Sequence, residues 1–217
     1  MDGKITALRV QQRRKDRVSV FLDDEYAFGL QIVVAAHLRL GQHLSAEEIA
    51  QLRERDAAER AYENALRFLS YRPRSEWEMR QYLQKKKVDD ETAAEVLQRL
   101  SRIGLVDDEE FARQWVASRE ANRPRGVWGL RAELRQKGVA DKVIHAAVSD
   151  VDEEEGALRV ARRRAVRLAG LDKQTFHHRL LSFLQRRGFS YDVSRQVTNR
   201  LWQEVDAQHG PDGEKRA

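Results

Sequence analysis

The feature that most constrains this chain is an internal repeat of about fifty residues. Three segments align on a shared leucine, which falls at Leu83, Leu134 and Leu184. Apolar residues recur around each leucine in steps of four, the spacing of one face of an α-helix. Fifty residues are close to the lower size limit for a self-sufficient core, so neighbouring repeats must share their stability. Four residues before and five residues after each leucine stand Met79, Leu130, Leu180, Val88, Val139 and Phe189.

Each repeat is predicted to contain three helices: a first helix, a middle helix that holds the leucine, and a third helix that packs back after a tight turn. The first helices are expected near 57–70, 109–121 and 155–169. The turn favours glycine, because a residue in the left-handed conformation avoids a steric penalty only when it lacks Cβ. Gly138 and Gly188 fit this rule, but the first repeat has Lys87. Either that repeat bears a cost of about 1 kcal/mol or its helix ends differently.

Helix-start signals support these boundaries. Ser75 followed by Glu78, and Ser45 followed by Glu48, have the spacing of a capping box. We interpret the segment 104–108 as structural, with Gly104 ending one helix and its aspartates beginning the next.

The amino-terminal residues follow a different pattern. Apolar residues alternate in 18–22 and again in 26–30, with Asp23 and Asp24 between them as turn residues. This pattern predicts a small hairpin or a three-stranded meander that includes 5–10. A short helix is expected over 32–38, followed by a helix that begins after Ser45 and runs toward the first repeat.

The predicted fold is therefore mainly α, with three tandem three-helix repeats behind a small strand-containing α+β module. The expected boundaries are 1–56 for that module, 57–106, 107–151 and 152–206 for the repeats, and 207–217 for a disordered tail. The chain lacks cysteine, which excludes disulfides and thiolate metal sites. It also lacks a signal peptide pattern and an apolar run of the roughly 20 residues that a membrane span needs. We expect a cytoplasmic monomer.

Five stretches of the sequence together resemble the RecX family of recombination regulators. They are FLDDEYAFGL (Phe21–Leu30), ALRFLSYRPRSEWEMRQYL (Ala65–Leu83), GLVDDEEFARQWVASR (Gly104–Arg119), GLRAELRQKGV (Gly129–Val139) and FLQRRGFSYDV (Phe183–Val193). They occur in order over nearly the full chain, and the departure is Lys87, where the family pattern usually has glycine. The resemblance implies a protein that lies in the helical groove of the RecA recombinase filament on DNA. There it would suppress filament growth, ATP hydrolysis, strand exchange and co-protease activity, and so affect homologous recombination, DNA repair and the SOS response.

Basic side chains are concentrated in the third repeat. Between Gly156 and Trp202 the chain has 11 Lys and Arg against two Asp, a local net charge of +9, whereas 1–56 and 107–151 are each neutral. Such a stretch could face phosphates or an acidic partner surface. The residues that we predict to contact the filament are Arg72, Arg74, Lys85, Lys86, Arg162, Arg163, Arg164, Arg167, Arg186 and Arg187.

Other functional readings receive less support. The four tryptophans, Trp77, Trp115, Trp128 and Trp202, could stack on bases, but their helical spacing favours packing within or between repeats. His177 and His178 are adjacent and so point to different faces of a helix, unlike a helical metal-binding pair. We therefore predict no enzyme activity, no metal and no cofactor. The rival functions are a helical DNA-binding protein that acts independently of a recombinase, and a purely structural helical scaffold.

Overall fold

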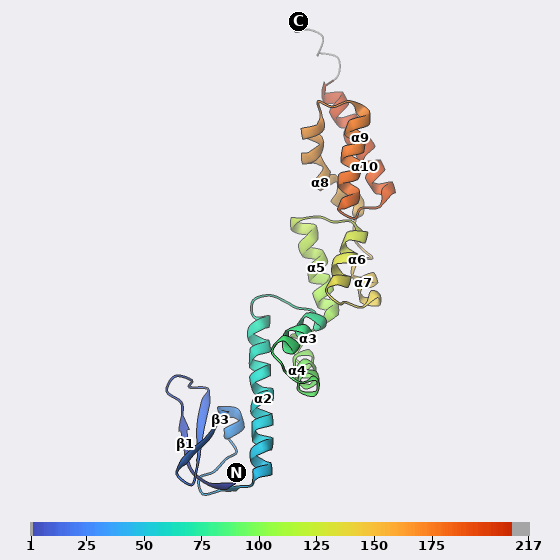
Figure 1. The fold of residues 1–217 in the computed structure, drawn as a ribbon. Helices are drawn as coiled ribbons and strands as arrows, with labels where there is room; N and C mark the ends of the chain where they lie inside the picture. The colour runs from blue at the N-terminus through green and yellow to red at the C-terminus, as the bar shows by residue number, and fades with distance from the viewer. Residues whose placement is uncertain (1, 210–217) are drawn as a thin grey trace. The chain divides into compact units, whose positions relative to one another are not determined.

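The computed structural model describes residues 2–209, and its elements follow one another as Figure 1 shows. Contacts divide the chain into two compact units, Met1–Arg74 with Met79–Val106, and Ser75–Glu78 with Asp107–Ala217. The predicted fold class, three helical repeats behind a strand-containing module, is confirmed. The elements are β1 (Gly3–Val10), β2 (Arg17–Leu22), β3 (Glu25–Gln31), α1 (Ile32–Ala35), β4 (His43–Leu44), α2 (Ala46–Leu69), α3 (Glu76–Lys85), α4 (Asp90–Arg102), α5 (Asp108–Asn122), α6 (Val127–Gln136), α7 (Asp141–Ala147), α8 (Glu153–Leu168), α9 (Lys173–Arg186) and α10 (Tyr191–His209).

The first unit begins with an antiparallel sheet in the order β3-β2-β1-β4. Asp23 and Asp24 both have positive φ, 46° and 70°, so they form the predicted tight turn between β2 and β3. The predicted meander is therefore confirmed, with β4 as an additional two-residue strand. Helix α1 is shorter than predicted, because the helical residues stop at Ala35.

Helix α2 is one continuous helix of 24 residues, so the predicted boundary between residues 56 and 57 falls inside it. Ser45 and Glu48 form the predicted capping box at its start. Ile49 is buried with the sheet, whereas Ala61 and Ala65 are buried with the first repeat. No glycine or proline interrupts 46–69, and a single helix therefore serves two cores.

The first repeat packs the end of α2 against α3 and α4, around the fully buried Met79, Leu83 and Leu100. Lys87 occupies the left-handed region with φ 59°. The Val88 N–H donates to the Leu83 carbonyl oxygen at 3.2 Å, as Val139 does to Leu134 in the second repeat. The turn is thus the same in both repeats, and the first repeat bears the steric cost of a side chain there.

The second unit contains the other two repeats, α5–α7 and α8–α10, each with its own core. The shared leucines Leu134 and Leu184 are fully buried. Helix α7 has 7 residues, against 13 in α4 and 19 in α10. Helix α10 continues to His209, two residues beyond the predicted start of the tail, and 210–217 lie outside the described residues.

Two joints of similar construction lie within this unit, which includes residues 75–78 at the start of α3. In the first joint the turn at Gly138 lies against Trp77, and the Ser75 hydroxyl donates to the Lys137 carbonyl oxygen. In the second joint the turn at Gly188 lies against Gly129, and the Gly126 N–H donates to the Arg187 carbonyl oxygen at 3.2 Å.

A Cβ at either turn glycine would come closer than 3.0 Å to the neighbouring repeat. Positive φ, 74° at Gly138 and 81° at Gly188, adds to this requirement. Glycine therefore serves two purposes at these turns. It adopts positive φ without a steric penalty, and it leaves room for the preceding repeat to approach.

A carboxylate from the following repeat completes each joint by capping the start of the middle helix. The Glu76 N–H donates to Asp108 Oδ1 at 2.8 Å, and the Val127 N–H donates to Glu153 Oε1 at 2.7 Å. Negative charge is favourable at a helix amino terminus, where the first N–H groups lack intrahelical partners. Burial raises the pKa of Asp108, and its hydrogen bond from Glu76 opposes that shift.

Candidate functional site

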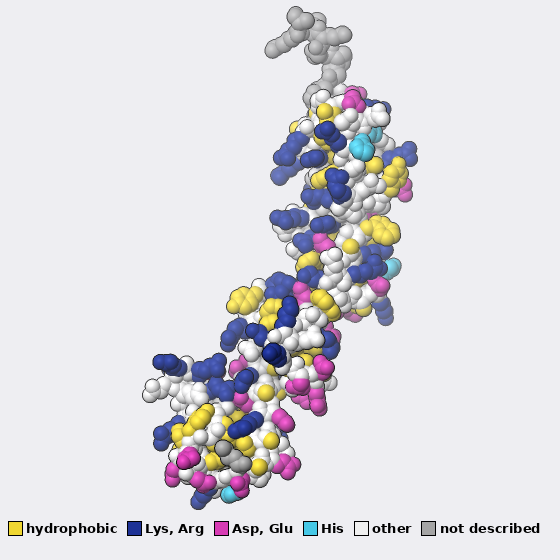
Figure 2. Space-filling view, viewed as in Figure 1, with side chains coloured by type: hydrophobic (Ala, Val, Ile, Leu, Met, Phe, Trp, Pro, Cys, Tyr) yellow, Lys and Arg dark blue, Asp and Glu magenta, His cyan; other side chains and the backbone are white. Residues whose placement is uncertain are grey.

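Helix α8 carries the strongest candidate surface, which we call the α8 basic face: Arg162, Arg163 and Arg167. All three side chains are exposed, and none forms an ion pair within residues 2–209. Figure 2 shows Lys and Arg side chains gathered over this helix. Two of the acids at the start of α8 are engaged elsewhere, since Glu153 accepts the Val127 N–H and Glu154 Oε1 lies 3.7 Å from Arg200 Nη1. The face is therefore available to an anionic partner.

Two arginines of the predicted set pack partly against protein groups. Arg164 is partly buried, and its guanidinium lies 5.7 Å from the centre of the Phe183 ring. Arg187 lies 5.0 Å from the same ring and donates to the Pro124 carbonyl oxygen at 3.4 Å. Arg186 is exposed. The arginines that we predicted to contact the filament therefore differ in their surroundings. Arg164 and Arg187 contact the third repeat and its joint, whereas Arg186 is exposed.

Arg72 and Arg74 also have structural contacts in the first unit. Arg72 Nη1 donates to the Pro73 carbonyl oxygen at 2.9 Å, and the Arg74 guanidinium lies 4.0 Å from the centre of the Phe68 ring. Both side chains are partly buried. A filament contact by these two residues stays a prediction.

The lysines at the end of α3 are exposed. Lys85 lies in the last helical turn, where the dipole favours a cation, and Lys86 Nζ lies 5.8 Å from the Tyr82 ring. The helix dipole alone therefore accounts for cations at this position, without a binding partner. Their filament contact stays a prediction.

The tryptophans do not share one environment. Trp115 donates to Glu133 Oε2 at 2.8 Å within the second core, and the Trp202 ring packs 5.1 Å from Phe176 in the third. Trp77 contacts Gly138 in the first joint while it is still 46% exposed. Trp128 is 65% exposed and joins no core. The packing prediction is therefore wrong for the Trp128 side chain, because the glycines beside it bring the two backbones together and leave the indole outside.

A second set of residues was missed by sequence reasoning: the buried pair of Arg17 and Asp56. Arg17 Nη2 lies 3.1 Å from Asp56 Oδ2 and 2.7 Å from the Gly29 carbonyl oxygen, and the Gln31 N–H donates to Asp56 Oδ1 at 2.6 Å. These contacts fasten the sheet to the middle of α2. The sequence signal for this pair was Asp56, a charged residue on the buried face of a predicted helix. Its partner Arg17 lies 39 residues away, so the sequence did not identify the pair.

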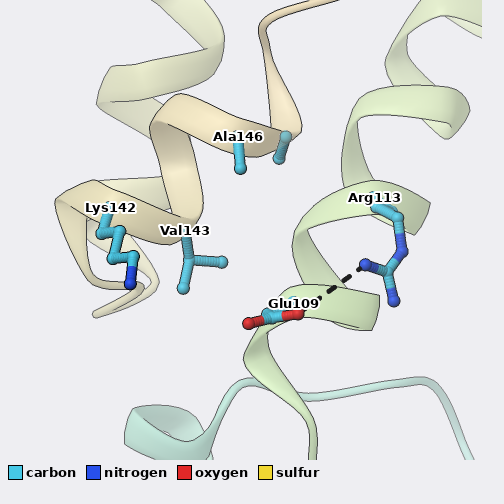
Figure 3. A pocket seen from close by; sticks show the side chains of 6 residues that line it. Glu109, Arg113, Lys142, Val143 and Ala146 are labelled. Carbon is cyan, nitrogen blue, oxygen red and sulfur yellow. Dashed lines mark ion pairs between the residues drawn. The ribbon is translucent and has the colours of Figure 1, made fainter.

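The second repeat has a shallow hollow of about 220 Å³, drawn in Figure 3, where Glu109 and Arg113 of α5 face Val143 and Ala146 of α7. The Glu109 and Arg113 side chains form an ion pair at 4.0 Å. Small-molecule sites are usually about 300–1,000 Å³ and deeper. We attribute this hollow to the shortness of α7 and assign it no ligand.

The histidines that adjoin one another in α9 lie in different surroundings. His177 is partly buried near Trp202, and burial together with the charge of Lys173 lowers its pKa, whereas His178 is exposed. Within residues 2–209 no three His, Asp or Glu side chains gather as a metal site would require. In the same range we find no helix both long and apolar enough to cross a lipid bilayer.

Three three-helix units in tandem, joined turn to helix and preceded by a small sheet, define a helical repeat protein. Models of the RecX family match four parts of this chain: the Regulatory protein RecX N-terminal domain over residues 3–45, and the first, second and third three-helix domains over 61–100, 107–148 and 152–198. The chain therefore belongs to the RecX family of regulatory proteins.

Relatives and solved structures agree with this assignment. Regulatory protein RecX of Bacillus licheniformis is 32% identical over 98% of this chain and 81% of the relative, and that of Bacillus subtilis is 33% identical over 93% and 78%. A crystal structure of regulatory protein RecX superposes with a TM-score of 0.77 at 26% identity, covering 90% of this chain and 98% of the other. RecX from Lactobacillus salivarius shares the fold, with a TM-score of 0.61 at 22% identity over 70% and 98%.

Proposed function

We propose that this chain is a negative regulator of the RecA recombinase. It binds in the groove of the RecA–DNA filament and suppresses filament extension, ATP hydrolysis, strand exchange and co-protease activity in the bacterial cytoplasm. Membership of the RecX family supports the regulatory role, and the tandem repeats suit a polymeric partner. Linked modules that contact successive protomers act at high effective concentration, so that several weak contacts together give firm binding.

The observation that carries the proposal is the α8 basic face. Three exposed guanidinium groups on one helix, without carboxylate partners among residues 2–209, suit phosphates or an acidic filament wall.

The test compares the wild-type chain with the double variant Arg162→Glu/Arg163→Glu in a RecA ATP hydrolysis assay on single-stranded DNA. The wild type should inhibit, and the variant should require at least about tenfold more protein, since each reversed charge replaces attraction by repulsion. Arg13→Glu/Arg14→Glu is the matched control, because those two adjacent arginines are also exposed. Equal loss in both variants would show a general charge effect and remove the α8 basic face from the interface.

Binding to naked DNA, to RecA alone and to RecA filaments, each across a salt series, separates the regulator from an independent DNA-binding protein. Equal affinity for naked DNA and filaments, with no effect on ATP hydrolysis, would contradict the proposed function. A steep salt dependence would indicate phosphate contacts.

A further inference from the structure

The joint between the second and third repeats has an exposed aromatic side chain that its packing does not explain. Gly126 and Gly129 bring the first turn of α6 against the turn at Gly188, backbone to backbone. Trp128 lies between those glycines, yet it is 65% exposed and has no ring contact within the described residues. Tryptophan is usually largely buried, so a tryptophan that stays exposed between closely packed neighbours is unusual.

The same joint has more arginine side chains than carboxylates to pair with them. Arg125 Nε lies 2.8 Å from Glu133 Oε1, but Arg119 pairs with the same carboxylate at 2.7 Å. Glu153, a further acid of the joint, already accepts the Val127 N–H. Within residues 2–209, the side chains of Arg123 and Arg187 therefore have no carboxylate partner.

These cations also influence one another. Burial lowers the pKa of Arg187, and the positive charges of Arg125 and Arg123 lower it further. Like charges held together by a folded backbone repel, and an anion between them would relieve that repulsion. The Arg187 position is fixed by its stacking on Phe183 and by its hydrogen bond to Pro124, so the site is preorganised.

We propose that this joint grips a single-stranded nucleic acid, with Trp128 stacked on a base and with Arg123 and Arg187 on the adjoining phosphate. Sequence-independent single-strand binding combines these two features, because every base has a π-face and every nucleotide carries a phosphate. The proposal deepens the proposed function, on which it rests: the chain would hold the DNA strand directly as well as the recombinase.

The first joint provides an internal comparison. Trp77 occupies the position equivalent to Trp128, counted from the shared leucine, but its surroundings are balanced in charge. Lys137 Nζ lies 2.8 Å from Glu78 Oε1, and Asp108 caps the helix start. We therefore assign strand binding to the second joint and not to the first.

The test uses the full chain and a fluorescein-labelled oligothymidine of about 20 nucleotides. Trp128→Leu should weaken binding by roughly 5- to 100-fold, since stacking on one base contributes in that range. Trp77→Leu is the matched control and should bind as the wild type does. Trp128→Phe, which keeps an aromatic face, should recover part of the loss. Arg123→Gln should weaken binding and reduce the slope of log affinity against log salt by about one.

Circular dichroism checks that each variant keeps its helical content, and quenching of tryptophan fluorescence by unlabelled oligothymidine reports stacking independently. Quenching should fall in Trp128→Leu and persist in Trp77→Leu. The proposal is overturned if wild type does not bind the oligonucleotide, if Trp128→Leu binds as tightly as Trp77→Leu, or if the variants lose only recombinase binding, which would indicate an acidic protein surface. Because RecA inhibition by the wild type is measured separately, failure here leaves the proposed function standing.

Discussion

Replacing Gly188 with alanine tests whether the turn glycines serve close approach as well as backbone conformation. The control is Gly104→Ala, because Gly104 has a similar φ of 72° and its added Cβ would meet nothing within 4 Å. The control bears only the left-handed cost, about 1 kcal/mol. At Gly188 the Cβ would meet main-chain atoms of Gly129, which cannot rotate aside.

Overpacking against a fixed neighbour costs about 1–3 kcal/mol. Losing the adjoining hydrogen bond from Gly126 to Arg187 costs about 1 kcal/mol more. Gly188→Ala should therefore lose about 2–4 kcal/mol beyond the control. Native-state hydrogen exchange resolves the two sites, since it reports the opening free energy of α9 and of α4 separately. Equal losses in the two variants would refute the close-approach explanation and leave φ as the sole requirement.

Three further predictions concern single residues. Asp56→Ala should lower the opening free energy of the sheet by about 3–5 kcal/mol, seen in the exchange of β2 and β3 amides, because Arg17 stays buried without its partner; unchanged protection would contradict this. Lys87→Gly should stabilise the first repeat by about 1 kcal/mol in urea unfolding, and a loss would argue against strain there. Hydrogen bonds from Thr175 lower the pKa of Asp172, so its stabilisation is present above the ordinary value of 3.8 and is lost as pH falls through the lower folded value; Asp172→Asn should remove this dependence from an acid titration followed by circular dichroism.

The helical register was predictable because it depends on short-range periodicity. Leu83, Leu134 and Leu184 are all buried as expected, and Ser45 caps α2 through a residue only three positions away. Such signals are local, and the physics that produces them acts within one helix or one turn.

The individual fates of the arginines were harder to predict. Arg164 precedes the buried Ala165 and turns toward Phe183, whereas its neighbour Arg163 faces water. The position of each arginine around the helix, relative to the buried residues, indicated part of this difference. The exposure of Trp128 had no local signal, because the backbone that meets its neighbouring glycines comes from Gly188, sixty residues further along.

The joints also bear on whether copies of the chain can associate end to end. A contact that fits one repeat to the next is heterologous, and if both of its faces were exposed at the ends, copies of the chain could add end to end without limit. Lys87 places a side chain where the other turns have glycine. At the other end, α9 has 14 residues against 10 in α3 and α6, and Asp172 caps it internally. Neither end reproduces the faces that meet in the joints, so the fold itself disfavours end-to-end association of its copies.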